Sequence, residues 1–167
     1  MSTRGKQQFL NVYDQEHATT VKVLRAYPKD KLDLQPHPKL KTARELAWVF
    51  CLEPGLGVKG WNDEFVKSAP SGKAQEAPAD WDTLLAAIEK AHQDFRKLVA
   101  DASDAELEGK IHFFTAPKTM GEYSRMEWAW FLLHDQIHHR GQFSIYLRMA
   151  EGKVPSIYGP TADEPWT

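Results

Sequence analysis

Two histidines four residues apart are the strongest sign of chemistry in this sequence. His134 and His138 lie within a mostly apolar run from Trp128 to Leu147, and Gln142 continues the same spacing. Four residues of α-helix bring two side chains to within about 40° on one face and one turn apart, so both imidazoles can reach a single metal ion. Because the run is apolar on most sides, we expect these polar groups to face the core, where they need partners.

The helix that carries this pair has clear signals at both ends. Ser124 and Glu127 form a capping box, and Gly152 followed by Pro155 is a typical stop. These signals predict one helix of about 25 residues, nearly 40 Å long. No other predicted element is as long.

Three further helical segments are predicted from apolar residues spaced three and four apart. The first covers about residues 6–26, and the second begins at the capping box of Thr42 and Glu45 and ends or kinks close to Glu53, which directly precedes Pro54. The third begins at the Asp80 cap. Four helices predict an all-α four-helix bundle, in which metal sites are built from side chains on facing helices. The last helix would supply two ligands and a neighbour the third.

The remaining segments are expected to connect or cover these helices. Residues 28–41 and 68–79 are rich in turn-forming residues and predict loops, while residues 111–115 predict a short extended piece. The tail over residues 154–167 contains several prolines and is expected to lie extended over the bundle, giving a single domain over residues 1–167.

Composition excludes several classes of partner. With 167 residues and 42% hydrophobic residues the chain fits one compact domain, and a formal net charge of −2 gives no basic surface for nucleic acid or anionic lipid. Cys51 is the single cysteine, so an internal disulfide is excluded. The chain shows neither a signal-type apolar segment at its start nor a membrane-spanning run, and we expect a cytoplasmic protein.

The stretch from His134 to Gln142, running on to Arg148, resembles the signature of the DinB/YfiT-like family of bacterial four-helix-bundle proteins. Residues 42–48 are similar to the start of that family's second helix, and residues 158–164 to the tails of one branch. The resemblance covers nearly the whole chain. It implies the same fold as the helical pattern does.

The resemblance also implies a divalent metal ion, Zn or Ni, held by one histidine of the second helix and two of the last. His134 and His138 match the last-helix pair, but Val49 stands where the family often has its third histidine. We therefore expect Glu53, one turn further along the same face, to complete a set of two histidines and one glutamate with an open fourth position. His17, on the apolar stripe of the first helix, is the alternative third ligand and is otherwise an ordinary core histidine.

Two neighbours of the pair have expected roles of their own. His139 lies about 100° round the helix from His138, and Asp135 can orient it, either as a catalytic proton carrier or as a structural pair. Arg140 faces away from the pair and is expected to anchor the tail, through Asp163 or Glu164, or to lie at a dimer contact. His92 is expected to be half-exposed at the edge of the third helix.

Three classes of function remain open. The first is a metal-dependent enzyme acting on small molecules, either a thiol S-transferase in detoxification, as the resemblance implies, or a hydrolase. The second is a stress-associated protein that binds a metal or small ligand without turnover. The third is a metal-free bundle in which His134 and His138 are hydrogen-bonded core groups. Family analogy adds a homodimer, with Trp61 or Trp166 as exposed contacts.

Overall fold

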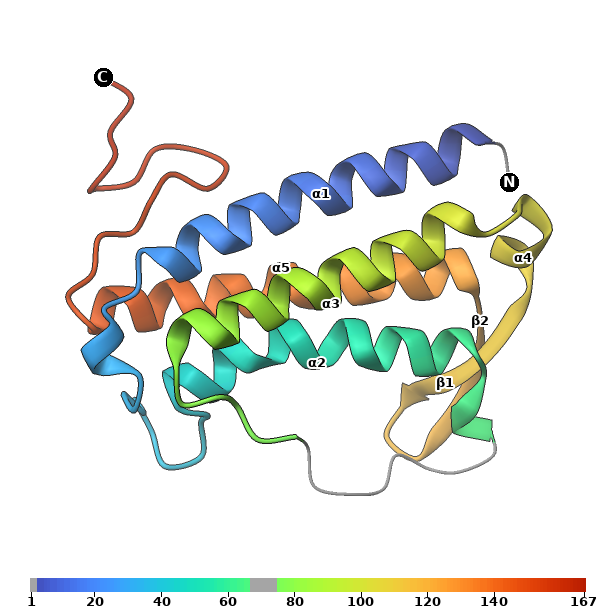
Figure 1. Ribbon diagram of the computed structural model, residues 1–167, viewed down its shortest axis with the longest axis horizontal. Coiled ribbons are helices and arrows are strands. Elements are labelled where there is room, and N and C mark those ends of the chain that lie inside the picture. Colours follow the sequence, from blue (N-terminus) through green and yellow to red (C-terminus); the bar gives the residue numbers. More distant parts are fainter. Residues whose placement is uncertain (1–2, 67–74) are drawn as a thin grey trace.

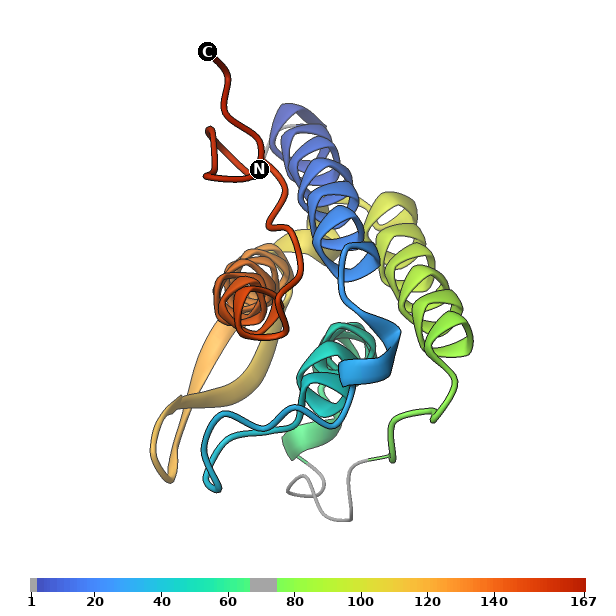
Figure 2. The same cartoon turned by 90° about the vertical axis from the view of Figure 1, so that its left-hand side faces the viewer.

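The computed structural model describes residues 3–66 and 75–167, and this part of the chain forms a bundle of four long helices (Figure 1). Seen along the bundle, the helices surround one interior and the C-terminal tail lies outside α1 and α5 (Figure 2). The predicted all-α four-helix bundle is confirmed. The long helices are α1 (Thr3–Arg25), α2 (Ala43–Trp61), α3 (Trp81–Asp101) and α5 (Arg125–Met149).

Capping residues fix where the helices begin. The Thr42 and Ser124 hydroxyls accept bonds from the backbone N–H three residues on, and the glutamates at those positions close both capping boxes. Asp80 caps α3 in the same way from its carboxylate. The predicted start of α5 and its length of 25 residues are confirmed.

Helix α2 does not end near Glu53, so the prediction of an end there was wrong. The helix continues through Pro54 and three glycines to Trp61. A Cβ on Gly57 would lie 2.8 Å from Phe95 and Leu132, and a Cβ on Gly60 would lie 2.6 Å from Trp128. Because glycine has no Cβ, α2 packs closely against α3 and α5 at these positions. This packing outweighs the weak helix propensity of glycine and places Glu53 in the middle of a continuous helix.

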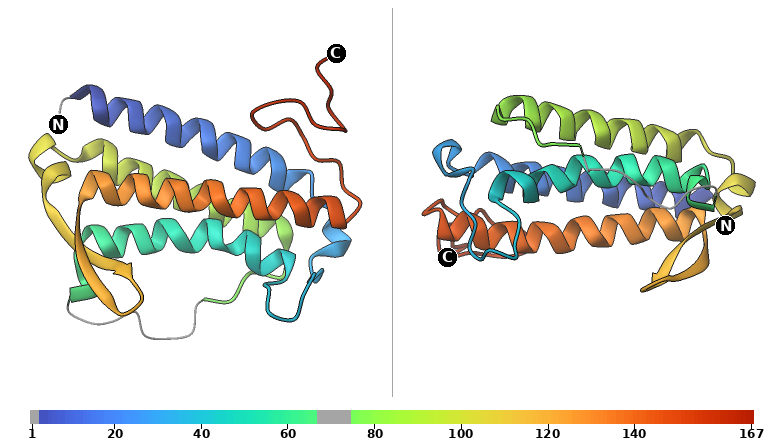
Figure 3. Two further views of the ribbon diagram at one scale, coloured as in Figure 1. Left: turned by 180° about the vertical axis from the view of Figure 1, so that it is seen from behind. Right: turned by 90° about the horizontal axis from the view of Figure 1, so that it is seen from below.

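A β-hairpin joins α3 to α5 through the short helix α4 (Asp104–Glu108). Strands β1 (Lys110–Ala116) and β2 (Thr119–Ser124) pair antiparallel, with Ile111 opposite Tyr123. The hairpin lies beside the end of α2 and the start of α5 (Figure 3). The expected extended piece at 111–115 is confirmed, whereas its partner strand was not predicted.

The connections and the tail contain little regular structure. Short 3₁₀ turns occur at Lys29–Lys31 and Glu64–Val66, and residues 75–80 contain no helix or strand. The rest of the predicted 68–79 loop, residues 68–74, lies outside the described residues. The tail is non-helical, as predicted. None of the described helices is both long and apolar enough to span a membrane.

Arg140 anchors the tail, as expected, but through a different partner. Its buried guanidinium lies 2.6 Å from the Glu16 carboxylate of α1 and donates a hydrogen bond to the Tyr158 hydroxyl. Asp163 instead pairs with Arg148, and Glu164 with Lys22. The tail is therefore attached to both α1 and α5.

Candidate metal centre

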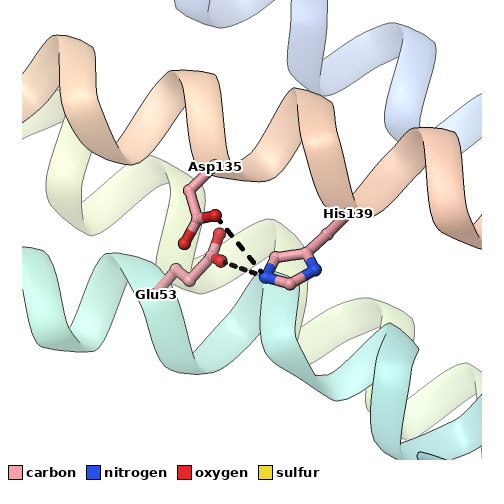
Figure 4. A group of neighbouring side chains, drawn as sticks. All are labelled: Glu53, Asp135 and His139. Carbon is pink, nitrogen blue, oxygen red and sulfur yellow. Dashed lines mark ion pairs between the residues drawn. The ribbon is translucent and has the colours of Figure 1, made fainter. Parts of the chain in front are cut away.

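Glu53 of α2 and Asp135 and His139 of α5 point toward one another between the two helices (Figure 4). His139 Nε2 lies 3.2 Å from Glu53 Oε1 and 3.7 Å from Asp135 Oδ1. One potential ligand atom of each residue lies within 4.8 Å of the other two. Asp135 and His139 are four residues apart and so share one face of α5.

The group is closed on its α2 side and open on its α5 side. The Glu53 side chain is 7% exposed, whereas those of His139 and Asp135 are 22% and 42% exposed. Neither carboxylate oxygen of Glu53 has a hydrogen-bond partner among the described residues. A buried carboxylate without partners is costly, so this one requires a compensating charge.

The pKa values of Glu53 and His139 are both raised above their ordinary values. Burial raises the pKa of Glu53, His139 opposes the shift and the Asp135 carboxylate adds to it, which together place the pKa at about 7. The Glu53 carboxylate, 3.2 Å from His139 Nε2, in turn raises the pKa of His139. Without a cation, the carboxyl and imidazole groups retain protons at a pH where isolated groups would lose them.

Gln142 fixes how His139 presents its nitrogens. Gln142 Oε1 lies 3.0 Å from His139 Nδ1, and Gln142 Nε2 lies 2.9 Å from His138 Nε2. An amide oxygen only accepts, so this orientation assigns the proton of neutral His139 to Nδ1 and leaves a lone pair on Nε2. That lone pair faces two carboxylates, and only a proton or a cation between them relieves the repulsion. Metal-binding histidines commonly have their other ring nitrogen held in this way.

The structure brings only one predicted ligand, Glu53, to this group. His134 and His138 are exposed, so the expectation that they face the core was wrong. The reason is that the orientation of α5 differs from the expected one by one residue, or about 100° around the helix axis. Helix α5 buries Gln136 and Arg140, and the pair that faces α2 is Asp135 and His139. Ligation of a metal by His134 and His138 stays a prediction, and they are not members of the group at Glu53.

The sequence contained a signal for the observed pair. Asp135 and His139 have the same four-residue spacing as His134 and His138, and they combine a carboxylate with an imidazole. The identical residue types of His134 and His138 drew attention to that pair instead. Asp135 had been given only an orienting role, although His139 was already a catalytic candidate.

His17, the alternative third ligand, lies in a separate cluster between α1 and α3. Its ring stacks on His92 with centroids 3.7 Å apart, and its Nε2 lies 2.8 Å from Glu89 Oε2. His92 also stacks on Tyr13 and is buried, so its expected half-exposure was wrong. Burial, together with the nearby His17, lowers the pKa of His92 to about 4, which favours a neutral ring.

The fold and the group together define a class: a helical bundle with a mixed carboxylate and imidazole site between two of its helices. The sequence matches the DinB family over residues 1–166, and the chain belongs to that family. Among curated proteins, it is 26% identical over 157 residues to "Uncharacterized protein YrdA" of Bacillus subtilis (strain 168), covering 93% of this chain and 89% of that one.

Solved structures show the same fold. A DinB-like protein from Bacillus cereus ATCC 10987 aligns with a TM-score of 0.74 at 22% identity, covering 91% of this chain and 97% of the other. The DinB-like protein YjoA of Bacillus subtilis aligns with a TM-score of 0.67 at 13% identity, covering 90% and 97%. At these identities the likeness concerns the fold alone.

Proposed function

We propose that this protein binds a divalent metal ion through Glu53, Asp135 and His139 and uses it as an enzyme acting on a small molecule. One observation carries the proposal: a buried, unpartnered carboxylate faces the bare nitrogen of a histidine that Gln142 holds in place. Carboxylate and imidazole groups are common ligands of divalent metals in proteins. A cation bound between Glu53, Asp135 and His139 would balance the charge of the two carboxylates and accept the lone pair of the imidazole.

Each residue has a distinct part in this proposal. A bound metal ion would lower the pKa of a water or thiol ligand, so that a nucleophile forms near neutral pH. Glu53 supplies the buried negative charge, and Asp135 lies at the solvent side, where a small molecule enters. Gln142 keeps the His139 ring from turning.

Two kinds of reaction fit an open metal site. Activation of a water molecule would make the protein a hydrolase, and activation of a thiol would make it an S-transferase of the kind that the family resemblance implies. The half-exposed Asp135 supports access by a small molecule in both cases. The alternative function is a protein that binds metal or a small ligand without turnover.

The test begins with metal content. We expect untagged protein to bind about one divalent ion per chain and to gain thermal stability from it. Glu53→Gln and His139→Ala should lose that binding, whereas the matched control His138→Ala, which alters the adjacent exposed histidine, should retain it. Loss of metal from the control alone would refute the assignment and restore the first predicted pair.

A second assay separates an enzyme from a binding protein. Metal-loaded protein would be offered electrophiles together with low-molecular-weight thiols, and in parallel a panel of esters and amides. Turnover that disappears in His139→Ala and persists in His138→Ala supports an enzyme. Stoichiometric binding without turnover of any compound supports the binding protein.

A further inference from the structure

The donor atoms of the metal centre are mostly oxygen. Glu53 and Asp135 contribute carboxylates, and His139 contributes the single imidazole. Sulfur takes no part: Cys51, the only cysteine of the sequence, lies on α2 with its thiol 3.7 Å from the Ala87 carbonyl of α3. The expected Zn or Ni preference belonged to a set with two imidazoles, which the group does not contain.

We propose that this centre favours a hard, oxygen-preferring cation more than a histidine-rich site does, with Mn²⁺ rather than Zn²⁺ or Ni²⁺ as its resident ion where manganese is in excess. The inference rests on the proposed function, because it concerns the identity of the ion at that site. Carboxylate and water ligands suit Mn²⁺ and Mg²⁺, whereas imidazole suits Zn²⁺ and Ni²⁺. Two ionised carboxylates also cancel the charge of a divalent ion in a partly buried site.

The solvent exposure of the site also favours an ion that keeps several water ligands. Three protein ligands leave three positions of an octahedral ion but only one of a tetrahedral ion. Asp135 is 42% exposed and His139 22% exposed, so the open side of the group faces solvent, where water ligands are available. Glu53 alone is closed off by the bundle. The arrangement suits an ion that keeps several waters.

The substrate class follows from the ion. A hard cation with exchangeable waters binds oxygen ligands such as carboxylate, phosphate or hydroxyl groups better than it binds soft thiolates. The site therefore favours a small molecule that coordinates through oxygen. This shifts the reaction from thiol transfer toward hydrolysis or another reaction at an oxygen-bearing group.

The experiment measures a ratio of affinities, because Zn²⁺ binds more tightly than Mn²⁺ to nearly any such site in absolute terms. Metal-free wild-type protein would be titrated with Mn²⁺ and with Zn²⁺ by calorimetry, and Mn²⁺ binding checked by electron paramagnetic resonance. Asp135→His replaces one carboxylate by imidazole at a half-exposed position. We expect it to raise the ratio of Zn²⁺ to Mn²⁺ affinity roughly tenfold or more.

A matched control separates the site from general effects of adding a histidine. Asp94→His makes the same substitution at an exposed position of α3 and should leave the ratio unchanged. Protein purified from cells grown with manganese in excess over zinc should carry mainly manganese. If Asp135→His leaves the ratio unchanged, or wild-type protein carries zinc at full occupancy, the inference is overturned.

Failure of the inference differs from failure of the proposed function. Protein that binds one Zn²⁺ through the same three residues, with no gain in zinc preference on Asp135→His, would refute only the choice of ion. Protein that binds neither Mn²⁺ nor Zn²⁺ would refute both. Glu53→Gln is a second variant for both outcomes. It removes a carboxylate without adding an imidazole, and it should lose the binding of both ions.

Discussion

Glu53→Gln should make the metal-free protein less sensitive to alkaline pH. Burial raises the pKa of Glu53 from 4.5 to about 7 in the folded protein. A raised carboxyl pKa means that the folded state binds the proton more tightly, so this residue costs stability as pH rises from about 4.5 to about 7. A difference of about 2.5 pKa units corresponds to about 3 kcal/mol. Glutamine does not titrate, so the variant escapes this cost.

The assay compares urea unfolding of metal-free wild type and Glu53→Gln at pH 5 and pH 8. The difference in unfolding free energy should shift by about 2 to 3 kcal/mol in favour of the variant at pH 8. Any constant cost of the buried amide cancels, because it is the same at both pH values. Glu151→Gln, at an exposed position, should show no such shift. A pH-independent difference for Glu53→Gln would refute the claim that its carboxyl is buried without compensation.

Three further predictions concern the site and the packing around it. Gln142→Ala should weaken metal binding by about 10- to 100-fold in calorimetry, because the supporting hydrogen bond to the histidine ligand is lost. Metal affinity, measured by the same titration, should fall as pH drops below about 7, since protons compete for the buried carboxylate and its imidazole partner. Gly60→Ala should lower the unfolding free energy by about 1 to 3 kcal/mol in urea, because its Cβ would meet the Trp128 ring at 2.6 Å. In its matched control Gly55→Ala, where the new Cβ meets nothing within 4 Å, the same free energy should instead rise by about 0.5 to 1 kcal/mol.

The fold followed from the sequence because local signals agreed with one another. Capping boxes at Thr42 and Ser124 and the spacing of apolar residues fixed helix starts, and these signals act over a few residues. The continuation of α2 past Pro54 depends on tertiary packing instead. Glycines accept Phe95 and Trp128 from other helices, and no local pattern in α2 announces those neighbours.

The residues that lie beside Glu53 come from α5, as predicted, but they are Asp135 and His139 and not His134 and His138. Choosing between His138 and His139 requires knowing which side of a largely apolar helix faces α2, and the sequence of α5 contains apolar residues on several sides. A shift of one residue rotates a side chain by about 100°, enough to exchange solvent for the interior. Glu53 was identified because it lies one turn beyond Val49 on the same face of α2, and this spacing does not depend on the orientation of α5.

The most direct test of the proposed metal centre is the metal content of two variants at neighbouring residues. His139→Ala and His138→Ala would be purified untagged beside wild type, loaded with Mn²⁺, and measured by elemental analysis and calorimetry. A metal centre at Glu53, Asp135 and His139 should give about one ion per chain in wild type and in His138→Ala, and none in His139→Ala. Metal retained by His139→Ala and lost from His138→Ala would contradict it.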